Sequence, residues 1–200
     1  MEDNKRIISV QIANANQAEV YYADSPDPTS NLETAKSKLE QFVAKGYVFS
    51  GFNIKRFDIL LLSHFWNVHF PEASVFDLVS HNGVVGLRQY GIYGLENVCA
   101  QYGISVTHKQ KMNKRVQSNK VQTDIIAQAK AAASLIVKEK GGTLEFAFDE
   151  AIQKISMGRA IYDSYVEFIK NGHRRDSLFY EYAIGDVICE RQLLDVLMKK

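Results

Sequence analysis

Two aspartates, Asp58 and Asp186, and one tyrosine, Tyr182, are residue types that metal-assisted chemistry uses. Carboxylate oxygens are preferred ligands of Mg²⁺ and Mn²⁺. Asp58 stands in the segment GFNIKRFDILLL, after a short strand pattern and in the first turn of a helix pattern. Tyr182 and Asp186 are the first and last residues of YAIGD, and their i, i+4 spacing places them on one helix face. These segments are therefore the candidate parts of a divalent-cation site.

Each aspartate also has an ordinary structural explanation. In the first turn of a helix, Asp58 would simply complement the helix dipole. Asp186 continues an apolar helix face formed by Cys189, Leu193 and residues 196–197. A carboxylate on such a face is costly unless something pairs with it, but at the edge of the face it would reach water. The sequence leaves both explanations open.

The elements that must position these residues follow from the apolar patterns. Residues 6–13 and 19–23 predict a hairpin across ANANQ, and residues 31–45 predict an amphipathic helix that ends at Gly46. Further strands or short apolar segments are expected at 47–50 and 75–79, and helices at 57–66, 95–102, 123–140, 144–155, 158–170 and from about 176 to 197. Strands early and helices late predict an α/β fold with a βαβ unit over residues 6–50. We expect a single domain over residues 1–200, with a helical insertion around 107–157.

Composition says less about function than the local distribution of charge. The chain of 200 residues has a net charge of +1, 46% hydrophobic and 24% charged residues, which is typical of a soluble globular protein. The start is polar and no apolar run is long enough to span a membrane, so we expect a cytoplasmic protein without membrane contact. A stretch without acidic residues, from Glu96 to Asp124, carries Lys109, Lys111, Lys114, Arg115 and Lys120. Such a stretch either follows a phosphate backbone or is a solvated face.

Taken together, the two aspartate segments resemble the DEDD 3′–5′ exonucleases of the ribonuclease H-like superfamily, as found in DNA polymerase proofreading domains. GFNIKRFDILLL is similar to their second motif. YAIGD is similar to the third motif, Tyr-x-x-x-Asp, of the tyrosine (DEDDy) branch, because Glu181 stands where the histidine branch has its His. The segment LENVCAQYGI is similar to the helix between these motifs, and the resemblance covers roughly residues 47–197.

This resemblance implies an α/β fold of the ribonuclease H-like type, with a small central mixed sheet flanked by helices and a helix-rich C-terminal half. It also implies hydrolysis of DNA or RNA from a single-stranded 3′ end by two Mg²⁺ or Mn²⁺ ions, about 4 Å apart. Asp58 and Asp186 would be metal ligands, Asp58 directly or through water, and Tyr182 would orient the attacking water. The substrate contacts expected with them are Asn53, Lys55, Arg56, Lys111, Lys114 and Arg115.

The first motif of that family, Asp-x-Glu on the first strand, is missing before Asn53. If residues 6–14 are the first strand, Gln11 and Ala13 stand at the two acidic positions. The protein would then be an inactive module that binds nucleic acid or a protein partner. If residues 6–14 are instead the second strand, the first would precede Met1. A third alternative is that Glu2, Asp3 or Asp24 replaces the missing carboxylates in space.

A further hypothesis gives the protein no role with nucleic acid. Aromatic residues between 146 and 168 would then form a surface for a protein partner, although such residues more commonly pack in a core. Convergence of Asp58 and Asp186 on one site would argue against this hypothesis.

Overall fold

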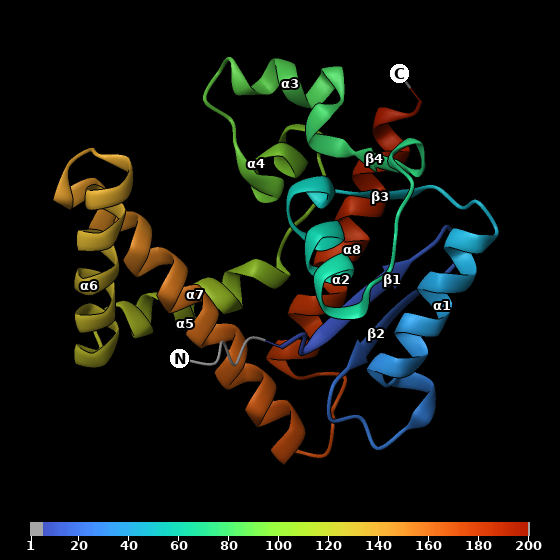
Figure 1. Cartoon of the computed structure of the whole chain (residues 1–200), viewed down its shortest axis with the longest axis horizontal. Coiled ribbons are helices and arrows are strands. Elements are labelled where there is room, and N and C mark those ends of the chain that lie inside the picture. Colours follow the sequence, from blue (N-terminus) through green and yellow to red (C-terminus); the bar gives the residue numbers. More distant parts are fainter. Residues whose placement is uncertain (1–5, 200) are drawn as a thin grey trace. The chain divides into compact units, whose positions relative to one another are not determined.

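The computed structural model describes residues 6–199, which are about 65% helical (Figure 1). The chain divides into two compact units. One runs to Val106 and resumes at Ala183, and we call it the sheet unit; the other, Thr107–Tyr182, is the helical unit. Within residues 6–199, no helix combines the length and the apolar character needed to cross a lipid bilayer.

In the described part of the sheet unit, four short strands form two separate pairs. β1 (Ser9–Ala13) and β2 (Ala18–Tyr22) are antiparallel, with Gln11 opposite Val20. The turn between them is closed by Asn14, whose Oδ1 accepts the N–H groups of Asn16 and Gln17 at 2.8 and 3.0 Å. β3 (Phe49–Gly51) and β4 (Val75–Asp77) are parallel. The predicted hairpin is confirmed.

Helices complete the sheet unit and enclose its core. α1 (Leu32–Ala44) begins at Asn31, whose side chain accepts the Thr34 N–H at 2.8 Å, and packs Ala35 and Leu39 inward. The others are α2 (Asp58–Trp66), α3 (Asn82–Arg88), α4 (Gly94–Gln101) and the part of α8 (Leu178–Leu197) from Ala183 onward. The core is formed by Leu78, Val84, Leu95, Val98, Cys99, Cys189, Leu193 and Leu197. Both cysteines are buried, and neither forms a disulfide among the described residues.

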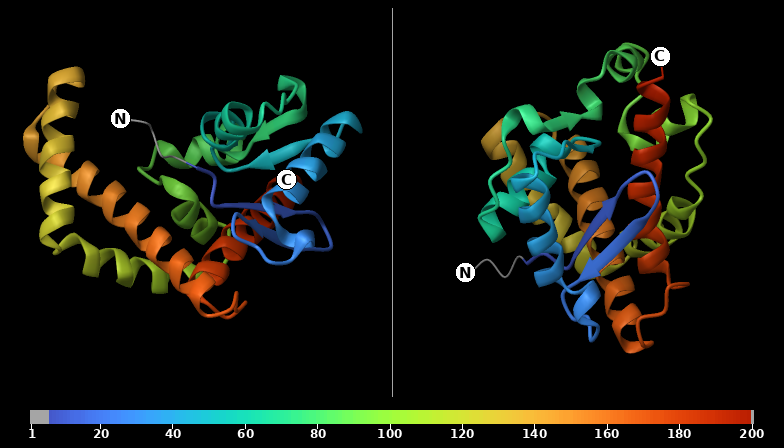
Figure 2. Two further views of the ribbon diagram at one scale, coloured as in Figure 1. Left: turned by 60° about the horizontal axis from the view of Figure 1, so that its bottom comes forward. Right: turned by 90° about the vertical axis from the view of Figure 1, so that its right-hand side faces the viewer.

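The helical unit consists of α5 (His108–Lys120), α6 (Thr123–Lys140), α7 (Leu144–Lys170) and the first residues of α8. α6 and α7 form a helical hairpin, and α5 packs along α7 (Figure 2). The prediction of two helices over residues 144–170 is wrong, because α7 continues through Gly158. A glycine inside a helix costs only about 1 kcal/mol relative to alanine. Burial of residues on the following turns, including Ala160, Tyr165 and Phe168, outweighs that cost.

The predicted ribonuclease H-like fold is wrong for this structure. That fold requires one central mixed sheet, whereas residues 6–199 form two sheets of two strands each. The predicted βαβ unit over residues 6–50 is absent too, because β1 pairs with β2 and β3 pairs with β4. No strand among the described residues hydrogen-bonds to both pairs, so the two pairs are not joined into one sheet.

Candidate functional site

Asp58 and Asp186 line the same cavity in the sheet unit, which has a volume of about 680 Å³. Gln11 and Ala13, from β1, line it as well, and so does Glu190, one turn after Asp186 on α8. The wall of this one cavity therefore includes both motif aspartates and the two neutral residues at the expected acidic positions.

A buried carboxylate, Asp77, fixes the loop that carries Asp58. Asp77 is only 6% exposed at the end of β4, and its Oδ1 accepts the N–H groups of Asn53 at 2.9 Å and Val79 at 3.0 Å. Its Oδ2 accepts the N–H of Lys55 at 3.3 Å. Asn53 has a left-handed backbone, with φ of 65°. These bonds fold residues 53–56 into a tight turn and set the point at which Asp58 begins α2.

The electrostatic environment of Asp58 disfavours its charged form. Burial among the atoms of the cavity wall raises the pKa of its carboxyl group, and the negative charge of Asp77 raises it further. A hydrogen bond from the backbone of Asp58 itself opposes both effects. By its accessible surface, however, Asp58 is an exposed residue, so water screens these interactions and the rise in pKa has only a small effect on stability. A cation beside Asp58 would reverse the balance and favour the carboxylate.

The apolar face of α8 explains the position of Asp186. Cys189, Leu193 and Leu197 are buried in the core, and Asp186 lies half-buried one turn before Cys189. The Glu190 side chain reaches β3, because a Cβ atom placed on Gly51 would lie 3.3 Å from its Oε2 atom. Sequence analysis missed Glu190, although its i+4 spacing from Asp186 was the available signal. It missed Asp77 as well, whose signal was that it is the one acidic residue inside the apolar segment 75–79.

The residues present do not fit a site for two metal ions. Residues 6–199 contain no group of three or more His, Cys, Asp or Glu side chains arranged to hold a metal ion. A single Mg²⁺ makes smaller demands, because it is usually held by one or two carboxylates with water and substrate phosphates. Asp58 and Asp186 are the two motif carboxylates of this cavity, whose wall also contains those of Glu19, Glu190 and Asp195.

Other predicted site residues lie in different surroundings. Asn53, Lys55 and Arg56 form the turn before α2 and are not among the residues that line the cavity; Lys55 Nζ is 3.9 Å from Glu72. Tyr182 packs against the core cluster of the helical unit around Met112, Val116 and Ala160. Its ring centroid is 6.2 Å from that of His108.

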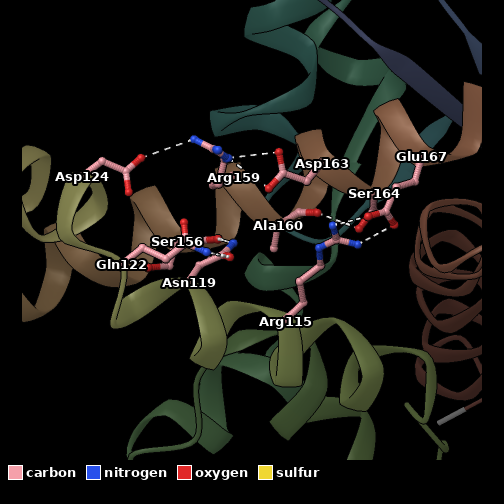
Figure 3. Close-up of polar contacts among 10 residues, drawn as sticks. All are labelled: Arg115, Asn119, Gln122, Asp124, Ser156, Arg159, Ala160, Asp163, Ser164 and Glu167. Carbon is pink, nitrogen blue, oxygen red and sulfur yellow. Dashed lines mark hydrogen bonds and ion pairs between the residues drawn. The ribbon is translucent and has the colours of Figure 1, made fainter. Parts of the chain in front are cut away.

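The basic stretch forms α5, and two of its three predicted substrate contacts are in ion pairs within the helical unit. Lys111 Nζ is 2.7 Å from Glu181 Oε2. Arg115 donates two hydrogen bonds to the Glu167 carboxylate, at 2.7 and 2.6 Å (Figure 3). Lys114 is exposed. The acidic partners come from α7 and α8, so two of the five basic residues of this stretch are paired with acids that are remote in sequence.

Of the residues suggested as spatial substitutes, Glu2 and Asp3 lie outside the described residues. Asp24 is 3.5 Å from Arg6 in an exposed ion pair and is not among the residues that line the cavity.

Comparison with known proteins adds no family or function: no protein-family model, no curated protein and no solved structure matches this chain. The geometry of the cavity is therefore the basis for a functional proposal.

Proposed function

We propose that the cavity is the site of a divalent-cation-dependent hydrolase that cleaves phosphodiester bonds at the 3′ ends of DNA or RNA. The observation that carries this proposal is that Asp58 and Asp186, from two distant exonuclease-like motifs, line one cavity. The motifs supply the substrate class, and the shared cavity supplies the reason to treat the aspartates as one site.

The chain's own contribution would be to hold and position one cation. A bound Mg²⁺ or Mn²⁺ polarises a phosphate oxygen and lowers the pKa of a coordinated water molecule. Asp58 and Asp186 would hold the ion, and Asp77 would keep the Asp58 loop in place through its three backbone hydrogen bonds. Because burial raises the pKa of Asp58, protons compete with the cation at this residue and weaken its binding at low pH.

A second candidate is a module that binds nucleic acid or a protein without cleaving it. Gln11 and Ala13 bring no charge to the cavity. Together with the lack of a three-ligand metal group within residues 6–199, they favour this alternative.

Cleavage of labelled single strands by the purified 200-residue protein would separate the two candidates. We expect 5′-labelled DNA or RNA to shorten progressively from the 3′ end with Mn²⁺ or Mg²⁺, and not with EDTA. Asp58→Asn and Asp186→Asn should abolish this, whereas Asp149→Asn, which removes an exposed carboxylate outside the cavity, should not. Cleavage that survives in Asp186→Asn would rule out the proposed site. Salt-dependent binding in EDTA without any cleavage, weakened by Lys114→Glu, would favour the second candidate.

A further inference from the structure

The hairpin has a free edge formed by alternate residues of β1. Ala23 donates its N–H to the Ile8 carbonyl and Asn14 donates its N–H to the Gln17 carbonyl, both at 2.9 Å. In an antiparallel pair these bonds alternate along the strand, so Val10 and Ile12 also direct their backbone groups toward β2. The residues between them, Ser9, Gln11 and Ala13, direct theirs away, and none has a backbone partner among the described residues.

That free edge faces the cavity, and so does β3. Every residue of β1 and every residue of β3 lines the cavity. Neighbouring residues of a strand point to opposite faces, so a strand lines a cavity with consecutive residues only along its edge. The β1 residues are half-buried, and backbone groups shielded from water in this way are costly when they have no partner. The cavity therefore separates two strand edges in need of hydrogen bonds.

The cavity has about the size of one short strand. A strand residue takes about 3.3 Å along the strand, about 4.8 Å to its neighbour and about 10 Å through the sheet, or roughly 160 Å³. The cavity volume of about 680 Å³ therefore corresponds to about four extended residues. The Oγ atom of Ser50, on β3, is buried and has no hydrogen-bond partner among the described residues. A polar group of an occupant would supply one.

The charge of the cavity wall indicates what kind of strand fits. The described residues of the wall include two cations, Lys38 and Arg191, and five carboxylates. Lys38 is bound to Glu19 at 3.0 Å. The carboxylates are those of Glu19, Asp58, Asp186, Glu190 and Asp195. The rest of the wall is largely apolar, with Leu39, Phe42, Phe49, Ile54, Leu62 and Phe70. An occupant with apolar side chains and flanking Lys or Arg would complement both features.

We propose that this cavity binds an extended, basic segment of a partner protein, which adds as a strand between β1 and β3 and joins the two pairs into one sheet. Strand addition of this kind takes its affinity from main-chain hydrogen bonds and its specificity from alternate side chains. The inference rests on strand edges and charge and not on the hydrolase proposed above, but a bound segment would occupy the same cavity and so compete with a nucleic-acid 3′ end.

Amide hydrogen exchange of the 200-residue protein, followed by NMR in EDTA, tests whether the edge is free. We expect the amides of Ser9, Gln11 and Ala13 to exchange at least tenfold faster than those of Val10 and Ile12, which are bonded to β2. Equal protection of both sets would overturn the proposal, because the edge would already be occupied by the chain itself.

Synthetic heptapeptides test the occupant. A pool of acetylated, amidated Lys-X-Thr-X-Thr-X-Lys peptides, with X as Val, Ile or Phe, should slow exchange at Ser9, Gln11 and Ala13 at least tenfold. The same pool with every backbone nitrogen methylated cannot donate hydrogen bonds to either strand edge and should give no protection, and a pool with Glu for Lys should bind more weakly. No protection at millimolar peptide, or equal protection by the N-methylated pool, would overturn the proposal.

A matched substitution locates the binding at β1. Gln11→Pro removes an N–H that points into the cavity and leaves the bonds to β2, which an edge strand tolerates. We expect peptide affinity to fall at least tenfold while Val10 and Ile12 stay protected. Unchanged affinity in this variant would contradict strand addition. If instead the amides of Val10 and Ile12 lose their protection from exchange, the substitution has disrupted the hairpin itself. The comparison of the unmethylated and N-methylated pools on the unsubstituted protein then decides.

Discussion

Asp58 and Asp77 are two carboxylates in contrasting environments that meet at one loop. Asp77 is buried, and its side chain accepts hydrogen bonds from three backbone N–H groups. Asp58 lies in the cavity wall, where burial first, and then the charge of Asp77, raise its pKa. Asp77 therefore holds the loop in place, while its negative charge disfavours the charged form of Asp58. A cation that neutralised Asp58 would relieve that cost.

The substitution Asp58→Asn should stabilise the protein at neutral pH. The raised pKa means that the folded state binds the proton more tightly than the unfolded state does. Asp58 therefore lowers stability as pH rises through the interval between the unfolded and folded pKa values. Because the side chain reaches water, we expect a gain of less than about 1 kcal/mol at about pH 7 and none at about pH 3. Thermal unfolding at both pH values, with Asp149→Asn as control, measures this. Destabilisation at neutral pH would show that Asp58 is favourably paired when charged.

Removing the Asp77 carboxylate should have a much larger effect. Asp77→Ala leaves the N–H groups of Asn53, Lys55 and Val79 without their acceptor, and the bond to Val79 is buried. Each buried N–H group left without an acceptor costs about 1–3 kcal/mol, so we expect a loss of about 2–4 kcal/mol in the free energy of unfolding. Urea denaturation gives this value, and Asp149→Ala, at an exposed position, should change it little. An effect below about 1 kcal/mol would show that water replaces the carboxylate in the turn.

Local signals were sufficient to predict much of the secondary structure. The hairpin depends on the Asn14 turn, and α1 depends on its apolar face and on Gly46, whose φ is 71°. The pairing of the strands was not predictable in this way. Whether β1 and β3 share a sheet depends on what lies between them, and neither strand carries that information. The break in the helix predicted before Gly158 was wrong for a related reason. Burial of α7 in the tertiary structure outweighs the low helix propensity of glycine.

The site was predictable in part, for similar reasons. Asp58 and Asp186 were identified from local motifs, and the structure places both at one cavity. Asp77 became evident only through its contacts with the backbone of a loop that lies earlier in the chain. The positive charge of the basic stretch was overestimated from the sequence, because the acids that pair with Lys111 and Arg115 are remote in sequence.

The Arg115–Glu167 pair should make a pH-dependent contribution to stability. The hydrogen bonds from Arg115, and then its charge, lower the pKa of Glu167, while partial burial opposes them. The contribution is therefore complete above the unfolded pKa of glutamate and is lost as pH falls through the lowered pKa of the folded state. Glu167→Gln should cost up to about 1 kcal/mol at about pH 7, and less in 1 M salt or in acid. Chemical denaturation measures this, with Glu145→Gln, an exposed glutamate on the same helix, as control. A loss that does not change with pH would mean that packing, not charge, is responsible.

Two serines of α7 provide a matched test of a buried hydroxyl group. Ser156 is completely buried, and its Oγ has no hydrogen-bond partner among the described residues, although its carbonyl accepts from Asn119 Nδ2 at 3.3 Å (Figure 3). Ser164 is equally buried, but its Oγ donates to the Ala160 carbonyl at 2.7 Å. Replacement by alanine gives both positions the same gain in helix propensity, so the difference between the variants isolates the hydroxyl groups. We expect Ser156→Ala to be more stable than Ser164→Ala by about 1 kcal/mol in urea denaturation, because only the first removes an unsatisfied polar group. Equal stabilities would mean that Ser156 finds a partner in solution, such as a buried water molecule.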